Sequence, residues 1–303
     1  GLLTLVGALD DVLDLPARQK LFAQIAAAGI LVFGGDLRVE NLGAMFGGGA
    51  VELGWASHPF TLLVIVGFIN AVNMVDGVDG LAGCVALAMT AGLAVVEWST
   101  TGSVHPVTLL VSGAVIGFLL HNFPIVPTRV PKSFMGDSGA LLLGTSIAWI
   151  ALHLTSNASS ASAPPILVAA VLATPVFDTV ILMIRRVTKG QSPMAADRDH
   201  LHHVFQRAGF DKRAIVFLVT AAVAITELSA IAIWQLSGWE AGVSLLLGVV
   251  LVAHSAFVLR AWKFVRLFRL LSRRRRQPVP REEVRALQLI PPRRASFERQ
   301  RAP

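Results

Sequence analysis

The sequence between residues 60 and 80 joins a run that suits the interior of a membrane to a polar cluster that does not. It reads Phe60-Thr-Leu-Leu-Val-Ile-Val-Gly-Phe-Ile69, followed by Asn70-Ala-Val-Asn-Met-Val-Asp-Gly-Val-Asp-Gly80. The first part carries no charge and can lie in lipid, whereas Asp76 and Asp79 require a polar cavity or water. The glycines in the second part predict that the helix breaks or tightens at this point.

Four polar side chains of this stretch, Asn70, Asn73, Asp76 and Asp79, follow one another at intervals of three residues. On a helix this spacing places them on one broad stripe. The simpler interpretation is a helix end with polar caps. Two amides and two carboxylates supply more oxygen than a cap requires, so the stripe predicts a binding site.

The composition indicates a polytopic membrane protein. Hydrophobic residues make up 54% of the chain and charged residues 15%, with a mean hydropathy of +0.66, whereas a soluble domain has about a quarter charged residues. We therefore expect an all-α, multi-helix transmembrane bundle. The single cysteine, Cys84, excludes an intramolecular disulfide and a cysteine-based metal site. Because the chain begins at Gly1 within an apolar run, we expect further helices to precede it.

Apolar segments predict where the chain crosses the membrane. The expected spans cover 20–34, 59–75, 81–98, 106–122, 139–154, 165–184, 214–235 and 241–262, with 1–9 as the end of another. The connecting segments then alternate between two faces of the membrane, and we call the face that receives the turn at 76–80 the first face. Of the 26 Lys and Arg, only Arg38 falls on the second face. The positive-inside rule makes the first face, with its catalytic loops, cytoplasmic.

Four polar clusters fall on that first face. They are Asp10-Asp11-Val-Leu-Asp14 with Lys20, the stripe from Asn70 to Asp79, Phe134-Met-Gly-Asp137-Ser-Gly139, and Asp197-Arg198-Asp-His200-Leu-His202-His203. They are far apart in sequence but can converge where helix ends meet. Carboxylates, amides, histidines and cations together predict a site for a metal ion and phosphates.

The first and third clusters each have a catalytic and an ordinary interpretation. Asp10, Asp11 and Asp14 can bind Mg²⁺ or take a proton, or they can form a helix-end turn. Asp137 lies in a glycine-containing turn that opens an apolar helix, where it can serve an anion site or act as an N-cap. Phe134 can stack on a base or lie at the membrane interface.

The histidine cluster favours an anion over a transition metal. Arg198 with His200, His202 and His203 offers phosphate donors, and no closed set of zinc ligands is evident. Asp178, in an apolar span, should face the bundle interior, where structural pairing and a role in the site are equally open. Lone histidines in or beside spans and loops, His58, His105, His153 and His254, are not expected to be ligands.

The C-terminal segment is basic and aromatic. Cations at Arg260, Lys263, Arg266 and Arg269 recur every third residue among Leu, Phe and Trp. This pattern indicates a helix at an anionic lipid surface rather than a nucleic-acid site. We expect a transmembrane catalytic domain over 1–262 and a basic tail over 263–303, disordered from 277.

Taken together, the four motifs resemble those of the polyprenyl-phosphate N-acetylhexosamine-1-phosphate transferases (glycosyltransferase 4 type). The resemblance covers nearly the whole chain, in the family's motif order, and the family's two most N-terminal helices and most of its third are absent here. The stretch from Asp197 to His203 resembles the branch that uses UDP-GlcNAc and undecaprenyl phosphate.

The resemblance implies a reaction and roles for residues. A polyprenyl phosphate would attack the β-phosphorus of a UDP-N-acetylhexosamine, giving polyprenyl-diphosphate-sugar and UMP and initiating cell-envelope polysaccharide synthesis at the bacterial cytoplasmic (inner) membrane. Asp137 and Asn73 would bind Mg²⁺, with Mn²⁺ as an alternative ion. Asp10, Asp11 and Asp14 would be catalytic, with Asp10 or Asp11 deprotonating or orienting the acceptor phosphate.

The remaining residues would bind substrate. Phe134 would stack on uracil, and Asp76 and Asp79 would help hold the nucleotide. The cations and histidines would neutralise the diphosphate. The substrate-binding set is Lys20, Asn70, Asp76, Asp79, Asn122, Phe134, Asp178, Arg198, His200, His202 and His203.

Several alternatives stay open on sequence alone. Another UDP-N-acetylhexosamine or UDP-MurNAc-pentapeptide could be the donor, and the transfer could proceed in one step or through an aspartyl intermediate. A secondary transporter is a remote alternative, because it would show internal repeats and polar residues at mid-membrane. A nucleic-acid partner would leave the aspartate clusters unexplained, and a homodimer is neither required nor excluded.

Overall fold

The computed structural model describes residues 1–123, 133–156, 162–192, 200–260, 263–266 and 268. The described helices are α1 (Leu2–Leu13), α2 (Ala17–Gly29), α3 (Ser57–Val75), α4 (Leu81–Thr101), α5 (Pro106–Asn122), α6 (Gly136–Thr155), α7 (Pro165–Thr188), α8 (Leu201–Ala208), α9 (Lys212–Ser237) and α10 (Glu240–Leu259). No strand occurs in these ranges, where one isolated bridge pairs Asn41 with Glu52. The predicted all-α class is confirmed.

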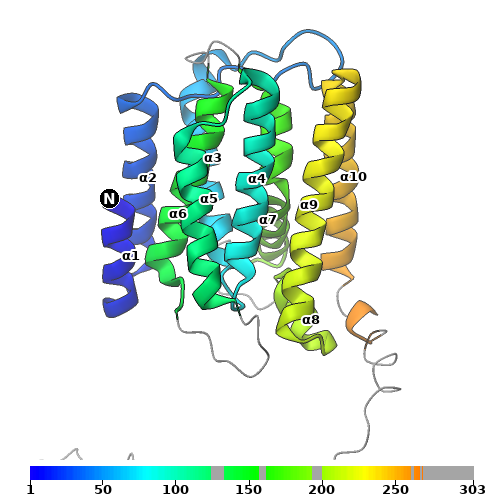
Figure 1. Ribbon diagram of the computed structural model, residues 1–303. Helices are drawn as coiled ribbons and strands as arrows, with labels where there is room; N and C mark the ends of the chain where they lie inside the picture. Colours follow the sequence, from blue (N-terminus) through cyan, green and yellow to red (C-terminus); the bar gives the residue numbers. More distant parts are fainter. Residues whose placement is uncertain (124–132, 157–161, 193–199, 261–262, 267, 269–303) are drawn as a thin grey trace, which may run out of the picture.

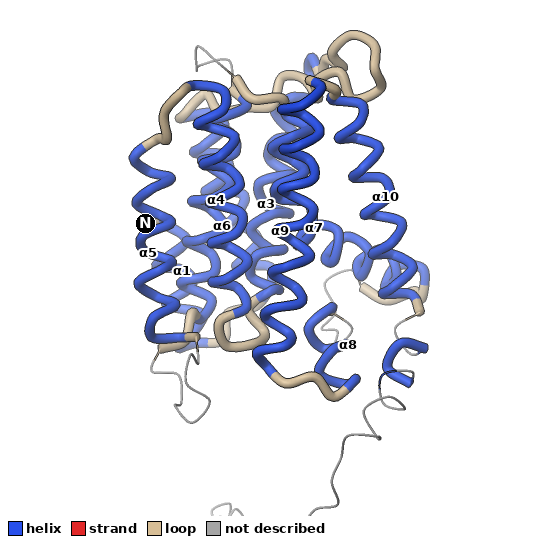
Figure 2. Tube along the Cα trace, turned by 45° about the vertical axis from the view of Figure 1, so that its right-hand side comes forward, coloured by secondary structure: helices blue, strands red, loops and turns tan. Residues whose placement is uncertain are grey.

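The long helices lie side by side and alternate in direction, so consecutive connections fall at opposite ends of the bundle (Figure 1). The short helix α8 lies beyond one end, and both Figure 1 and Figure 2 place it there. We call this end the α8 end. The connections 14–16 and 76–80 and the residues 189–192 and 263–266 lie at the α8 end, while 35–53, 102–105 and 238–239 lie at the opposite end.

The apolar segments form the helices that their length and composition predict. Six helices of the described ranges, α3, α4, α6, α7, α9 and α10, are long and apolar enough to cross a membrane. Helix α5 is apolar but shorter, and α2 continues as a π-helix over Ile30–Gly34, which completes the span expected at 20–34. The multi-pass character of the chain is therefore confirmed. Among the lysines and arginines that the structure describes, Arg38 alone lies at the opposite end.

Small residues set the closest helix contacts, as is usual in membranes where backbones pack directly. Gly7 of α1 lies on the backbone of Ser138 at the start of α6, so that a Cβ at residue 7 would clash with that backbone. Gly144 of α6 lies against Ile69 of α3, with 3.1 Å from the position of a Cβ to the Ile69 Cα. Helix α6 therefore packs closely against both α1 and α3, the helices that lead into the first two polar clusters.

The connections at the opposite end are held by their own polar contacts. The Ala44 amide donates a hydrogen bond of 2.7 Å to Glu240 at the start of α10. Glu97, near the end of α4, is buried and accepts hydrogen bonds from the His105 amide and the Thr108 hydroxyl at the start of α5. Glu240 and Glu97 are therefore engaged in hydrogen bonds that hold the connections at this end.

The contact at Gly7 yields a prediction about stability. Gly7→Ala should lower the free energy of unfolding by about 1–3 kcal/mol, because the added methyl group meets backbone and forces α1 away from α6. The measurement is thermal and denaturant unfolding in detergent. Gly67→Ala in α3 is the control, since a Cβ there meets nothing within 4 Å, and it should be neutral or stabilising. Equal effects of the two substitutions would contradict the contact.

Candidate functional site

Lys20 of α2 joins the first polar cluster to the third. Its Nζ lies 2.7 Å from Asp10 Oδ2 at the end of α1 and 3.2 Å from Asp137 Oδ2 at the start of α6. The other oxygen of the Asp10 carboxylate accepts the Leu15 amide at 2.8 Å. Two carboxylates 127 positions apart in the chain therefore share one cation at the α8 end.

Asp11 caps helix α6 from outside that helix. Its Oδ1 accepts the Asp137 amide at 3.0 Å and its Oδ2 accepts the Ser138 amide at 3.4 Å. Residue 136 has a positive φ of 62°, and a Cβ there would lie 2.8 Å from the Asp11 carboxylate. Glycine is thus required for both the backbone conformation and the approach of Asp11. The sequence allows Asp137 to be the N-cap of this helix. In the structure the Asp11 carboxylate accepts the first amides of α6 instead, and it places a negative charge at the helix N-terminus.

The stripe from Asn70 to Asp79 divides into structural and free side chains. Asn70 exchanges hydrogen bonds with Gln24 of α2, at 2.7 and 3.3 Å, and also donates to the Val66 carbonyl. Asp79 Oδ2 lies 2.6 Å from Nζ of Lys212 at the start of α9. Asn73 is half-buried and has no side-chain hydrogen bond with described residues.

The turn after α3 is fastened by Asn122. Gly80, whose φ is +83°, donates its amide to Asn122 Oδ1 at 2.6 Å. The Asn122 amide in turn donates to the Ser133 carbonyl at 2.7 Å, just before Phe134. Asn122 is buried, with 4% exposure. It therefore links the end of the stripe to the approach to α6, and both polar ends of its side chain are in use.

Several carboxylates lie close together around the turn that follows α3. Burial is the largest cause that raises the pKa of Asp76 to about 6. Repulsion by the neighbouring carboxylates of Asp137, Asp79 and Asp11 raises this pKa further. Carboxylates of the first three polar clusters therefore lie close enough to one another to affect the pKa of Asp76.

Asp178 holds the histidine cluster in place. Its Oδ2 lies 2.9 Å from His200 Nδ1, and its Oδ1 accepts the Leu201 amide at 3.3 Å. The same Oδ1 lies 3.1 Å from Nε2 of His254 on α10. Asp178, on α7, is buried and shares its oxygens among three donors from α8 and α10.

His202 brings the fourth cluster onto the second. Its ring lies against Gly77, and the position of a Cβ at residue 77 would be 2.7 Å from His202 Cε1. Burial lowers the pKa of His202 to about 4, with the neighbouring His203 and His200 as further causes. At neutral pH His202 is therefore uncharged and can offer hydrogen bonds but no positive charge. His203, with its ring centroid 4.2 Å from that of His202, is half-buried and pairs with Gln206.

The structure therefore brings all four clusters to one place, although not every residue in them. Asp14 is exposed, with the left-handed φ of 51°, and its side chain has no hydrogen bond or ion pair with described residues. Phe134 is 75% exposed. Arg198 and the neighbouring Asp197 lie outside the described residues, as does most of the tail beyond 262.

Sequence reasoning missed three partners of the predicted residues, namely Gln24, Lys212 and His254. Gln24 is the one amide in an otherwise apolar run, and a buried polar side chain at such a place signals a partner. Lys212 opens a span on the basic face. His254 lies in an apolar span, and its Nε2 lies 3.1 Å from Asp178 Oδ1.

The donor set of the site fits a hard cation. Asp137 and Asn73 offer carboxylate and amide oxygen, which Mg²⁺ prefers, and the carboxylates of Asp137, Asp79 and Asp11 add to the burial that raises the pKa of Asp76. Among the described residues no group of three or more His, Cys, Asp and Glu is arranged to hold a metal by itself.

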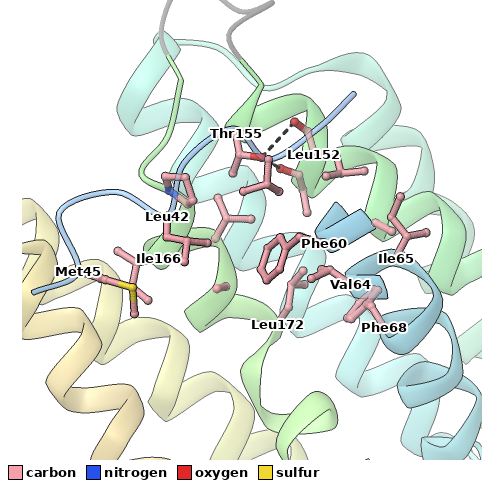
Figure 3. A pocket seen from close by; sticks show the side chains of 16 residues that line it. Leu42, Met45, Phe60, Val64, Ile65, Phe68, Leu152, Thr155, Ile166 and Leu172 are labelled. Atoms are coloured by element: carbon pink, nitrogen blue, oxygen red, sulfur yellow. Dashed lines mark hydrogen bonds between the residues drawn. The ribbon is translucent and has the colours of Figure 1, made fainter. Parts of the chain in front are cut away.

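A cavity away from the polar clusters has a different character. It has a volume of about 310 Å³ and lies among α3, α6, α7 and the 35–53 connection (Figure 3). Thr155 is the one polar side chain that lines it, and its hydroxyl already donates to the carbonyls of its own helix. Nothing there can hold a phosphate, so the chemistry belongs to the polar clusters at the α8 end.

Comparison with known proteins identifies the family of the chain. The sequence model described as Glycosyl transferase family 4 matches residues 1–155. The chain is 32% identical over 283 residues to undecaprenyl-phosphate alpha-N-acetylglucosaminyl 1-phosphate transferase of Escherichia coli (strain K12), covering 91% of this chain and 76% of that protein. It is 33% identical over 243 residues to the probable undecaprenyl-phosphate N-acetylglucosaminyl 1-phosphate transferase of Bacillus subtilis (strain 168), covering 78% and 65% of the two chains.

The raised pKa of Asp76 predicts a pH-dependent stability. The folded state favours the protonated form, so the contribution of Asp76 is complete below its ordinary pKa of 3.8 and is lost as the pH rises through about 6. Asp76→Asn should therefore raise the melting temperature at pH 8 and leave it unchanged at pH 4, in detergent with a chelator.

The control for this substitution is Asp36→Asn, because the Asp36 side chain is 86% exposed at the opposite end. It should shift the melting temperature little at either pH. A stabilisation by Asp76→Asn that is the same at pH 4 and pH 8 would rule out the charge as its cause.

Proposed function

This chain belongs to glycosyl transferase family 4, and we propose that it transfers N-acetylglucosamine 1-phosphate from UDP-GlcNAc to undecaprenyl phosphate, with UMP as the second product. The observation that carries the proposal is the meeting of Asp10, Lys20 and Asp137 at the ends of three helices, beside the carboxylate-rich turn at Asp76. Such a place suits a water-soluble donor and a lipid acceptor, which can meet only at a membrane face. The product would initiate an envelope polysaccharide.

The reaction is a phosphoryl transfer, in which positioning and charge do most of the catalysis. An oxygen of the acceptor phosphate forms a bond to the β-phosphorus of the donor. The bond from that phosphorus to the bridging oxygen breaks, and its electron pair leaves with UMP. Lys20 counters the negative charge that builds up on the transferred group, and Asp10 fixes the Lys20 ammonium by its 2.7 Å contact.

Asp10 and Asp11 prepare the place of attack. Asp11 fixes the first turn of α6, and with it Asp137, through two backbone amides. Either carboxylate can take the proton of a protonated acceptor phosphate, which makes its oxygen a better nucleophile. Asp14, exposed at the end of α1, has the freedom to turn toward a substrate.

A divalent cation completes the site in this proposal. Asp137 and Asn73 would hold Mg²⁺, with Mn²⁺ as the alternative ion, and the bound ion would neutralise diphosphate oxygens. Lys20 and Asp137 form an ion pair in the structure. With Asp137 holding that ion, the Lys20 ammonium would be available to a phosphate.

The other motif residues would bind the donor. Phe134, exposed beside α6, is free to stack on uracil. Asp76 and Asp79 would hold the nucleotide, and the histidine cluster with Arg198 would contact the diphosphate. His202 contributes neutral hydrogen bonding there, because its pKa of about 4 keeps it uncharged.

The location of the site follows from charge. All the described lysines and arginines except Arg38 lie at the α8 end, and the positive-inside rule places such an end in the cytoplasm. We therefore propose a bacterial inner-membrane enzyme with its site on the cytoplasmic face, where UDP-sugars are made.

The test is a transfer assay on the full-length protein in detergent. It supplies Mg²⁺, undecaprenyl phosphate and, in parallel, radiolabelled UDP-GlcNAc, UDP-GalNAc or UDP-MurNAc-pentapeptide, and it counts label in the lipid phase and UMP released. We expect transfer from UDP-GlcNAc. Asp137→Asn should lower kcat by about 10²–10³-fold, the usual cost of removing one group that stabilises transition-state charge.

Glu52→Gln is the matched control, because it removes a carboxylate charge from an exposed position at the opposite end and should leave kcat unchanged. Transfer from a different donor alone would keep the chemistry and overturn the sugar. A well-folded sample that transfers from none of the three donors would overturn the proposed function.

A further inference from the structure

His254 lies outside the four motifs, yet it touches the residue that supports one of them. It belongs to the last apolar helix, α10, and its side chain is 9% exposed. Its Nε2 lies 3.1 Å from Asp178 Oδ1, and the opposite oxygen of that carboxylate lies 2.9 Å from His200 Nδ1. The two histidines are thus joined by one buried carboxylate, across α10, α7 and the start of α8.

We propose that His254 is a positioning residue for the transfer reaction. It holds the Asp178 carboxylate in one orientation, and Asp178 in turn fixes His200 and the first turn of α8, which carries His202 and His203. The inference rests on the proposed function, since it concerns the histidines expected at the diphosphate. It adds a residue from a helix that carries none of the motifs.

Helix α8 depends on outside contacts for its position. It has only eight residues and no side-chain cap of its own, and short helices are marginal without tertiary packing. Asp178 supplies the missing acceptor by taking the Leu201 amide at 3.3 Å. Asp178 therefore acts as a cap for α8 while it binds both histidines.

A buried carboxylate with three donors has one favoured orientation. Its Oδ1 is shared by His254 and the Leu201 amide, and its Oδ2 takes His200. Removal of His254 leaves a buried acceptor incompletely satisfied, and such a group rotates or recruits water to recover a partner. Either change disturbs the two contacts that hold α8.

Helix α10 contacts α8 by packing as well. Phe257, one turn beyond His254, has its ring centroid 5.6 Å from that of Phe205 on α8. Helix α8 also packs against α9, and its Val204 and Ala208 lie in a buried cluster with Val265. The polar chain through Asp178 adds hydrogen bonds at the start of α8, where His200 and Leu201 lie.

Small motions of α8 reach the site directly. His202 lies against Gly77, in the turn that carries Asp76 and Asp79. A tilt of α8 moves this ring relative to the carboxylates. A misplacement of about 1 Å in a positioning group can cost about 10²-fold in rate.

The kinetic test compares two substitutions of His254. His254→Leu removes the donor and keeps an apolar side chain, whereas His254→Gln keeps an N–H donor near the place of Nε2. We expect His254→Leu to lower kcat about 10–100-fold while KM for undecaprenyl phosphate stays within about threefold, and His254→Gln to remain within about threefold of the wild type. His153→Leu, on α6 at the opposite end, is the matched control and should have no effect on kcat.

Dependence on Asp178 is tested by a double substitution. In the Asp178→Ala background, His254 has no carboxylate to hold, so adding His254→Leu should lower kcat by less than about twofold further. A full additional loss would show that His254 acts by another route and would overturn the proposal. Equal losses for His254→Leu and His254→Gln would overturn it as well.

A substrate-free measurement separates this inference from the proposed function. Amide hydrogen exchange of 201–208 in the full chain should be faster in His254→Leu than in the wild type and unchanged in His254→Gln. Unchanged exchange in His254→Leu would overturn the positioning role whatever the substrate proves to be. Faster exchange with an unaltered kcat would show that α8 is held by His254 but that its position does not serve the transfer.

Discussion

The contact of Lys20 with Asp10 and Asp137 is the interaction on which the rest of the site depends. It joins the ends of α1, α2 and α6 at the edge of an apolar bundle, where an unpaired charge is expensive. The pairing is possible only because Gly7 lets α1 reach the backbone of α6. Helix packing and charge pairing therefore support each other, since the approach of the backbones sets the distance at which the charges meet.

The polar residues of the motifs fall into two groups, those bonded to other protein groups and those without such partners. Asn122 and Asn70 are engaged with protein groups on both ends of their side chains, and Asp178 with three donors. They hold the turn, the second helix and α8. Among the described residues, the side chains of Asp76, Asn73 and Asp14 have no such partner, and Phe134 is exposed. A motif in this chain thus contains its own scaffold, because a buried polar site requires that its unused donors and acceptors be satisfied.

Helix α8, which carries His202 and His203, also depends on residues that lie outside the motifs. His202 reaches the carboxylate-rich turn, but its burial keeps it neutral. Its placement depends on α7 and α10, which contribute no motif. The position of this short helix therefore rests on long helices elsewhere in the bundle.

The sequence by itself determined the helices, their alternation and the end at which the polar clusters gather. Apolar length and the distribution of Lys and Arg are local properties, and a membrane leaves the backbone no alternative to helix. It also determined which residue types form the site, since Asp137, Asp76 and His202 all carry chemistry that a lipid environment forbids elsewhere.

Only the tertiary structure decided which of these side chains are bonded to groups of other helices and which are not. Asp11 accepts backbone amides at the start of α6, and this contact follows from the crossing of two helices more than a hundred positions apart in the chain. Gln24, Lys212 and His254 acquired partners in the same way. A hydrogen bond needs its two atoms within about 3 Å, and sequence spacing specifies that distance within one helix but not between helices.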